Sequence, residues 1–258
     1  MSNIIEDAKR NAAYKAVDEQ INASTKVIGI GSGSTIPYAV QRLASLRLPI
    51  EACIPTSFQA QQLILKHNLP LATLTQFPML DVAIDGADEV DPKLNCIKGG
   101  GACLLQEKLV SSNAAKFVVV ADDRKKTECL GSFWTQGIPV EVIPMAYMAV
   151  TRILVESFGL HPNNSVQLRL AGSAKAGPVV TDNGNFILDV KFDCLAVQSN
   201  AKPMHLVWLA EDPQKLHLSV IQIPGVVETG LFCGSTGAHV AYFGKLDDAS
   251  VVTIHKNN

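Results

Sequence analysis

The sequence lacks the features that would assign it to several common functional classes. Its formal net charge is only −2 over 258 residues, so there is no basic excess with which to bind a nucleic acid or an anionic membrane surface. Its longest apolar runs, such as KFVVVA, have the length of a strand and are far too short to span a bilayer. The opening stretch, MSNIIEDAKRNAAYKAVDEQI, is polar and carries early acids, unlike a signal or transit peptide. We therefore expect a cytoplasmic protein with no nucleic-acid or membrane partner.

Metal-binding and redox motifs are missing as well. The six cysteines are scattered without a CxxC pair, so we expect reduced thiols in the core. A disulfide between Cys96 and Cys103 is possible, but the pattern does not suggest it. The six histidines show no HExxH or comparable spacing, so we expect no zinc site. With 47% hydrophobic residues, the chain is long enough for one large domain or for one domain with a smaller partner.

The first half of the chain alternates β-branched runs with amphipathic stretches, a pattern typical of parallel βαβ units. We predict strands at residues 26–31, 50–57, 79–85 and 116–122, and helices at 34–46, at 58–68 and around Glu107. Three of these strands end in a motif rich in Gly, Ser or Asp. Because ligands of open α/β sheets bind beyond the carboxyl ends of the strands, these motifs should lie at one edge of one sheet.

The pattern changes near residue 132. A strand-like stretch at 138–145, a helix at 146–159 and a hairpin signal at 179–190 indicate an α+β module. Residues 239–244 and 250–255 should return to the main sheet. We therefore predict an α/β domain formed by residues 1–131 and 234–258, with a smaller α+β domain, residues 132–233, inserted into it.

The stretch GIGSGST, residues 29–35, lies at a strand-to-helix junction. Its third glycine position holds Ser34, so the dinucleotide pattern GxGxxG fails, and no P-loop ending follows. Bare amides and the hydroxyls of Ser32, Ser34 and Thr35 at a helix N-terminus would suit an anion. An ordinary tight turn with a Ser/Thr cap explains this stretch equally well.

The stretch DGADEVD, residues 85–91, places four carboxylates within seven residues after a predicted strand. Their mutual repulsion is costly unless cations or hydroxyl donors are nearby, and the pattern is not that of a calcium loop. Asp85 and Asp88 would accept hydrogen bonds from sugar hydroxyls or move protons. The alternative is a solvated acidic turn.

The stretch KGGGACLLQEKLV, residues 98–110, is the most unusual. Three consecutive glycines are costly to order, so their amides should serve an approaching anionic oxygen, with the positive charge of Lys98 beside them. Glu107, three residues after Leu104, should lie on the flank of the buried stripe of its helix. Burial beside apolar groups raises the pKa of a carboxylic acid, which suits a general base. The alternative is a surface glutamate paired with Lys108.

At this point the chain resembles the ribose-5-phosphate isomerase family of the A type, from about residue 8 to its C-terminus. The resemblance rests on seven stretches in order: GIGSGST, DGADEVD, IKGGGACLLQEKLV, KFVVVADDRKK, PVEVIPMA, VVTDNGNFILDV and IPGVVETGLF. It implies a Rossmann-like α/β domain with a small α+β module, assembled as a homodimer or homotetramer. It also implies interconversion of ribose 5-phosphate and ribulose 5-phosphate in the non-oxidative pentose phosphate pathway, without metal or nicotinamide cofactor.

The resemblance also implies roles for particular residues. Glu107 would carry the proton between C2 and C1, and Asp85, with Asp88 beside it, would assist ring opening. Lys98 and the amides of residues 99–101 would hold the enediolate oxygen. The substrate-binding residues it implies are Ser32, Gly33, Ser34, Thr35, Asp85, Gly86, Ala87, Asp88, Lys98, Gly99, Gly100, Gly101 and Lys125. In the turn ADDRKK, Lys125 matches the substrate-binding lysine of the family, although Lys126 could take the same role. Arg124 stands where the family commonly has a small residue. The segment near 191–215 is longer than the family pattern.

Four other functions can be compared with the sequence. A non-catalytic sugar-phosphate sensor would use the same amides but would not need Glu107. An acyl-CoA transferase or an amino-sugar-phosphate deaminase on a similar fold would not require a lysine and three glycines before that glutamate. A nicotinamide-dependent dehydrogenase is disfavoured by the glycine pattern.

Overall fold

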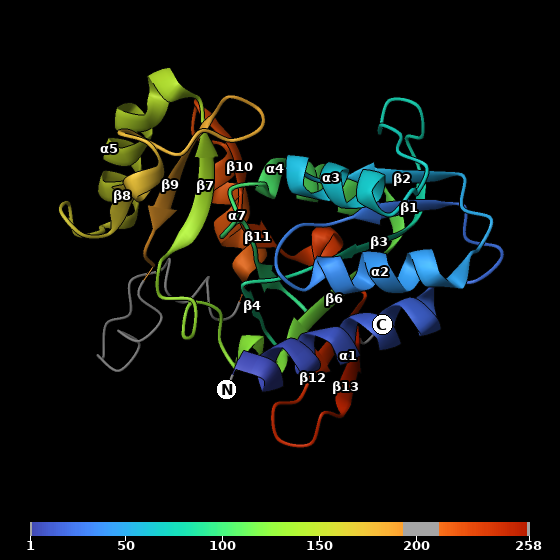
Figure 1. Cartoon of the computed structure of the whole chain (residues 1–258). Coiled ribbons are helices and arrows are strands. Elements are labelled where there is room, and N and C mark those ends of the chain that lie inside the picture. Colours follow the sequence, from blue (N-terminus) through green and yellow to red (C-terminus); the bar gives the residue numbers. More distant parts are fainter. Residues whose placement is uncertain (1, 193–211, 257–258) are drawn as a thin grey trace. The chain divides into compact units, whose positions relative to one another are not determined.

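The computed structural model describes residues 2–192 and 212–256. Within these residues the chain divides into two compact units (Figure 1). The first comprises residues 1–87, 106–126 and 235–258, and the second comprises residues 88–105 and 127–234. The domain boundaries expected from the sequence stay a prediction; in this structure residues 88–105 group with the second unit.

The first unit is built on a six-stranded sheet with the order β13-β12-β6-β3-β1-β2. Its strands are β1 (Val27–Ile30), β2 (Ala52–Pro55), β3 (Leu80–Asp85), β6 (Ala114–Asp122), β12 (Val240–Gly244) and β13 (Val251–His255). Every neighbouring pair is parallel except β12 with β13. The predicted parallel α/β sheet, with the C-terminal residues returning to it, is confirmed.

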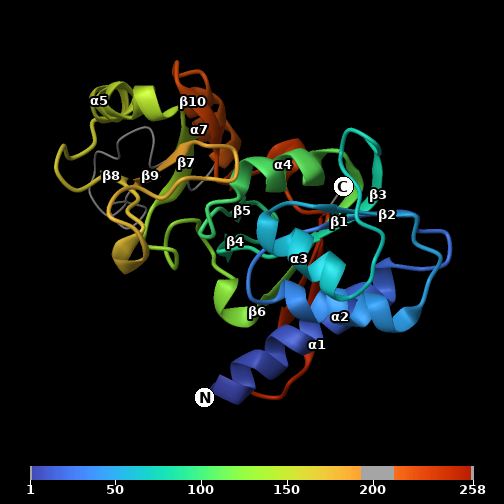
Figure 2. The ribbon, with the colours of Figure 1, turned by 45° about the horizontal axis from the view of Figure 1, so that its top comes forward.

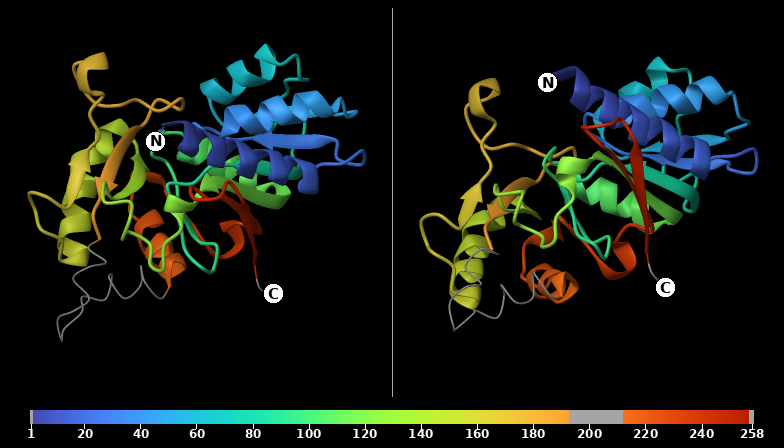
Figure 3. Two further views of the ribbon diagram at one scale, coloured as in Figure 1. Left: turned by 60° about the horizontal axis from the view of Figure 1, so that its bottom comes forward. Right: turned by 90° about the horizontal axis from the view of Figure 1, so that it is seen from below.

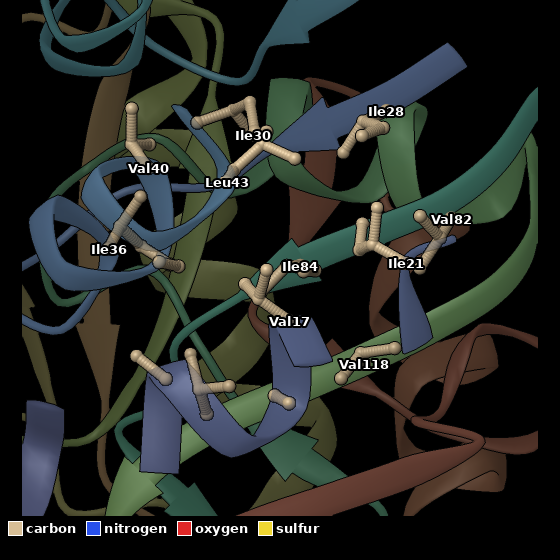
Figure 4. Close-up of a cluster of buried hydrophobic side chains, with 14 of the residues drawn as sticks. Val17, Ile21, Ile28, Ile30, Ile36, Val40, Leu43, Val82, Ile84 and Val118 are labelled. Carbon is tan, nitrogen blue, oxygen red and sulfur yellow. The ribbon is translucent and has the colours of Figure 1, made fainter. Parts of the chain in front are cut away.

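Helices cover both faces of this sheet. The helices α1 (Ser2–Gln20), α2 (Ile36–Leu46) and α3 (Phe58–Lys66) contribute side chains to one core cluster with Ile28, Ile84 and Val118 of the strands. Figure 4 shows Val17 and Ile36 of two of these helices beside the strand residues of that core. The helix α4 (Leu104–Ser112) lies on the opposite face, as Figure 2 shows.

Local sequence explains why these helices form where they do. The buried residues of α2 recur at helical spacing: Ile36, Ala39, Val40 and Leu43. The side chain of Ser57 caps α3 by accepting a hydrogen bond from the Ala60 N–H. The N-terminal α1 packs against α2 and, as Figure 3 shows, runs beside β12 and β13. No helix within residues 2–192 and 212–256 has the length and apolar character needed to cross a membrane.

The second unit contains two antiparallel sheets. The larger has the order β10-β7-β9-β8 and the smaller the order β11-β5-β4. Their strands are β4 (Glu89–Val90), β5 (Cys96–Ile97), β7 (Ile138–Val142), β8 (Val166–Leu168), β9 (Phe186–Val190), β10 (Val226–Thr229) and β11 (Leu231–Phe232). The helices α5 (Tyr147–Phe158) and α7 (Pro213–Ile221) pack on one face of the larger sheet, against Val140, Leu188 and Val190. Odd-numbered strand residues, among them Pro139, Ile187 and Asp189, therefore face the other way.

The predicted hairpin at 179–190 is wrong in its first arm. The strand β9 pairs with β7 and β8 and not with residues 179–181. The polar turn instead closes around Glu141, which is fully buried and whose Oε1 accepts hydrogen bonds from Thr181, Asn183 and Asn185. A buried carboxylate needs such donors, so the turn supplies them to one oxygen of Glu141 and does not extend a ladder. Most of the segment near 191–215 lies outside the described residues.

Candidate active site

The loop after β1 approaches the end of β3 very closely. A Cβ on Gly31 would lie 2.0 Å from Oδ1 of Asp85, so only glycine fits there. The backbone N–H groups of Ser32 and Gly86 donate to that same Asp85 oxygen at 2.9 and 2.7 Å. Asp85 is 2% exposed, so its carboxylate is held in one orientation at the carboxyl end of its strand.

The hydroxyls of the GIGSGST loop are partly used inside the fold. The Ser32 hydroxyl donates to Ser57 Oγ at 2.6 Å and lies 3.0 Å from Thr56 Oγ1. The N–H of Gly33, which has a positive φ of 97°, donates to Gln59 Oε1 at 2.8 Å. Ser34 is exposed and Thr35, which precedes α2, is buried. The sequence suggested that all three hydroxyls are open to an anion, but the Ser32 hydroxyl already has partners inside the protein.

Backbone amides offset the crowding of carboxylates in DGADEVD. Asp88 Oδ2 accepts the Gly100 N–H at 2.7 Å. Asp91 accepts the N–H groups of Lys93 and Asn95, both at 2.8 Å, and the Asn95 side-chain amide at 2.7 Å. These amide donors lower the cost of holding the carboxylates close together, because hydrogen bonds from backbone N–H groups stabilise a charged carboxylate.

Glu89 is fully buried and organises a distant loop. Its two carboxylate oxygens accept the backbone N–H groups of Gly131, Ser132, Phe133 and Trp134 at 2.7–3.3 Å. The Trp134 ring in turn lies close to the glycine run, because a Cβ on Gly100 would be 2.9 Å from its Cη2. Sequence reasoning assigned no role to Glu89 or Trp134, since nothing local indicates which amides a buried acid will meet.

Lys98 is buried, with 3% of its surface exposed. Its N–H donates to the Gly230 carbonyl at 2.9 Å, which continues the pairing of β5 with β11. Its Nζ lies 5.4 Å from the ring centroid of Phe232, within cation–π range. A charged ammonium group is thus held in a mostly desolvated position directly before the three glycines.

The three glycines differ in what the fold requires of them. Gly99 has φ +99°, and a Cβ there would lie 2.8 Å from Leu104 Cδ2 and 3.1 Å from Pro139 Cβ. A Cβ on Gly100 would lie 2.7 Å from Asp88 Oδ1. Gly101 has no positive φ, and no described atom lies within 4 Å of the place where its Cβ would be. Conformation and packing explain the first two glycines but not Gly101.

Glu107 lies in the first turn of α4 and is 5% exposed. Leu104 and Val110 on the same helix are also buried, so the carboxylate belongs to the buried side, as the spacing predicts. Of the alternative, a surface glutamate paired with Lys108, the surface position is wrong, since both side chains are buried. Burying a carboxylate is costly, and proteins keep such groups mainly where function or a specific ion pair requires them.

The basic turn after β6 forms a short 3₁₀ helix, η1 (Asp123–Lys125). The half-exposed Arg124 binds Asp122, whose side chain is 2% exposed, with its Nε at 2.6 Å from Oδ1. The Nζ of Lys126 lies 5.8 Å from the ring centroid of Phe243. Lys125 ends η1 and stays a predicted substrate-binding residue.

The predicted site residues are distributed over both units. The first unit holds Ser32, Gly33, Ser34, Thr35, Asp85, Gly86, Ala87, Glu107 and Lys125, and the second holds Asp88, Lys98, Gly99, Gly100 and Gly101. Hydrogen bonds bring Ser32, Asp85 and Gly86 together in one, and Asp88 and Gly100 together in the other. Within the described residues, no group of three or more His, Cys, Asp or Glu side chains is arranged to hold a metal ion.

Known proteins resemble this chain over nearly its whole length. A family model described as ribose 5-phosphate isomerase A (phosphoriboisomerase A) matches residues 52–248. The ribose-5-phosphate isomerase of Candida albicans is 49% identical over 248 residues, covering 96% of this chain and 95% of that protein. A ribose 5-phosphate isomerase structure from Plasmodium falciparum matches at 31% identity with a TM-score of 0.82, covering 100% of both chains. A D-ribose-5-phosphate isomerase in complex with phospho-erythronic acid has a TM-score of 0.81 at 36% identity, covering 97% of this chain and 99% of that one.

Proposed function

This chain belongs to the ribose 5-phosphate isomerase A family, and from that membership we propose that it interconverts D-ribose 5-phosphate and D-ribulose 5-phosphate through an enediolate. The family relation makes it an enzyme, an isomerase of aldose and ketose phosphates. The relative bound to phospho-erythronic acid, a phosphorylated sugar acid, supports a sugar phosphate as the substrate here.

The observation that carries the proposal is the burial of Glu107 at the start of α4, six residues after Gly101. In the proposed reaction, the Glu107 carboxylate takes the proton from C2 of the open-chain aldose, and negative charge collects on the C1 oxygen. The protonated Glu107 then delivers a proton to C1, and this proton is either the one taken from C2 or one exchanged with solvent. Meanwhile the C1 oxygen gains the proton that the C2 hydroxyl loses, so C2 becomes the carbonyl and no atom is gained or lost.

The largest catalytic contribution should come from stabilising the oxygen that becomes charged. The buried ammonium group of Lys98 and the bare backbone at Gly101 suit this task. The Gly100 N–H already donates to Asp88, so it serves the reaction indirectly by orienting that carboxylate. Asp85, with one oxygen fixed by two amides, and Asp88 are proposed to assist opening of the furanose ring.

The test replaces Glu107 with Gln, which keeps the shape and removes the base. Loss of a general base typically lowers the rate by about a hundredfold to ten-thousandfold, so kcat of Glu107→Gln should fall by at least that lower figure while KM stays within a few-fold. The matched control is Glu156→Gln, which changes a glutamate that is 59% exposed in α5 and should leave kcat unchanged. Wild-type turnover in Glu107→Gln would remove Glu107 from the mechanism.

The proton route has its own test in deuterated water. Purified protein incubated with ribose 5-phosphate should form ketose that carries deuterium at C1, with direct internal transfer diluting the label. Failure to form any ketose would refute the proposed activity itself.

Further proposals concern setting and assembly. We propose that the reaction serves the non-oxidative pentose phosphate pathway in the cytoplasm, that it needs no metal or nicotinamide, and that the chain forms a homodimer or homotetramer. Sedimentation of the purified protein tests the last point, since a monomer at the working concentration would contradict it.

A further inference from the structure

The mechanism above gives no role to Arg169, yet both backbone polar groups of this residue are hydrogen-bonded. It directly follows β8, and its N–H donates to the Ile187 carbonyl at 2.8 Å. Its own carbonyl accepts the Val179 N–H at 2.8 Å. Such anchoring gives the start of the side chain a defined position.

The guanidinium group of Arg169 holds two partners at once. Its Nε and Nη2 donate to the two oxygens of Asp189, Nε at 2.8 Å, in a bidentate pair. Its Nη1 donates to the carbonyl oxygens of Gly99 at 2.8 Å and Gly100 at 3.1 Å. Both charged side chains are only 13% exposed, so solvent screens these bonds little.

The geometry of the peptide bond gives these contacts a consequence. In a trans peptide the C=O of one residue and the N–H of the next point in opposite directions. Because Arg169 holds the Gly99 carbonyl, the Gly100 N–H must point away from it, and it does so toward Asp88 Oδ2. In the same way, holding the Gly100 carbonyl turns the Gly101 N–H away from Arg169.

An apolar cluster supports the same arrangement. Ala102 and Leu104, which follow the glycines, pack with Ile187 and Val179. Ile187 and Asp189 lie on the same face of β9, opposite the face that α5 and α7 cover. One face of the larger sheet of the second unit therefore carries both the apolar support and the charged fork for the glycine loop.

We propose that Arg169, itself oriented by Asp189, is a positioning residue for the isomerase reaction. It sets the two peptide planes so that the Gly100 amide orients Asp88 and the Gly101 amide faces the oxygen that becomes charged. This inference rests on the proposed function, because it assigns the amides a reacting partner. An arginine is required, since a lysine ammonium is a point charge without the planar fork that binds Asp189 and both carbonyls together.

The experiment compares four variants of the full chain: Arg169→Met, Arg169→Lys, the double variant Arg169→Met with Asp189→Asn, and Arg152→Met. Arg152 pairs with Glu156 on α5, and both side chains are largely exposed, so Arg152→Met is the matched control for loss of an arginine. Each variant is measured for kcat and KM with ribose 5-phosphate and for its midpoint of urea unfolding.

Because misplacing a catalytic group by about 1 Å costs about a hundredfold, kcat of Arg169→Met should fall by roughly that factor, with KM changed by less than about threefold. Arg169→Lys should not recover more than about a tenth of the wild-type kcat, since it keeps the charge but not the fork. Arg169→Met alone leaves Asp189 without its partner and should unfold at lower urea. The double variant removes that charge, so its urea midpoint should recover while its kcat stays low.

A purely structural role predicts that stability and kcat recover together in the double variant. That outcome, or wild-type kcat in a folded Arg169→Met, would overturn the inference. If the wild type and Arg152→Met are active and the double variant is equally active, only the role of Arg169 fails. If the wild type forms no ketose, the proposed function and the inference fail together.

Discussion

Substitution of individual glycines by alanine separates folding from catalysis in the segment 99–101. At Gly99 the positive φ costs an alanine about 1–2 kcal/mol, and the close contacts with Leu104 and Pro139 add about 1–3 kcal/mol of overpacking. Gly99→Ala should therefore lower the free energy of unfolding by about 2–5 kcal/mol in total.

Gly101→Ala meets neither penalty, because this residue has no positive φ and its Cβ would have no described neighbour within 4 Å. The free energy of unfolding of this variant should differ from the wild-type value by less than about 1 kcal/mol. The variant is more stable where alanine restricts the unfolded chain more than glycine does. If the backbone at Gly101 contacts the reacting sugar, however, the added methyl group displaces that sugar. A displacement of about 1 Å should lower kcat/KM by about a hundredfold.

Gly184→Ala is the matched control, since Gly184 has φ +80° but no described atom within 4 Å of its Cβ position. It should lose only the conformational cost of about 1–2 kcal/mol and keep full activity. Urea unfolding and steady-state isomerisation of ribose 5-phosphate measure the two quantities for all three variants. Wild-type kcat/KM in Gly101→Ala would refute the reasoning, because it would leave that bare backbone without a function.

Three further predictions test other parts of the structure. Activity should persist in excess EDTA, whereas a loss restored by a divalent ion would favour a metal at the acidic segment. Ser57→Ala should lower the free energy of unfolding by about 0.5–2 kcal/mol through loss of the α3 cap, and it also removes the acceptor of the Ser32 hydroxyl. Ser45→Ala, at an exposed position, is the control in urea unfolding, and equal midpoints for the two variants would contradict the cap. Partial burial, together with the charges of Lys256 and Lys116, lowers the pKa of His239, whose Nδ1 accepts the Phe117 N–H. Near pH 6.5 the unfolded chain then binds more protons than the folded chain, so stability should fall as pH drops below about 6.5 and level off below the folded-state pKa. His239→Asn keeps an acceptor without titrating, so its stability should fall less. Identical pH profiles for the variant and the wild type would exclude this contribution.

The sequence by itself predicts much of the fold of the first unit, because the signals are local and repeated. β-Branched runs alternate with stretches of helical spacing, and all four strands expected in the first half form within a few residues of the expected bounds. The burial of Glu107 also follows from its spacing to Leu104 and Val110. The hairpin at 179–190 failed because its turn residues bind a buried carboxylate, a contact that no local pattern indicates.

Only the tertiary structure distinguishes residues that look alike in the sequence. Three consecutive glycines read as one motif, yet contacts with Leu104 and Pro139 explain Gly99, a contact with Asp88 explains Gly100, and no described contact explains Gly101. Likewise, Asp85, Asp88 and Glu89 belong to one acidic cluster, but each meets amides from a different part of the chain. Local spacing determines which face of an element is buried, whereas hydrogen bonds between residues distant in sequence, such as Arg169 with Gly99, exist only once the chain has folded.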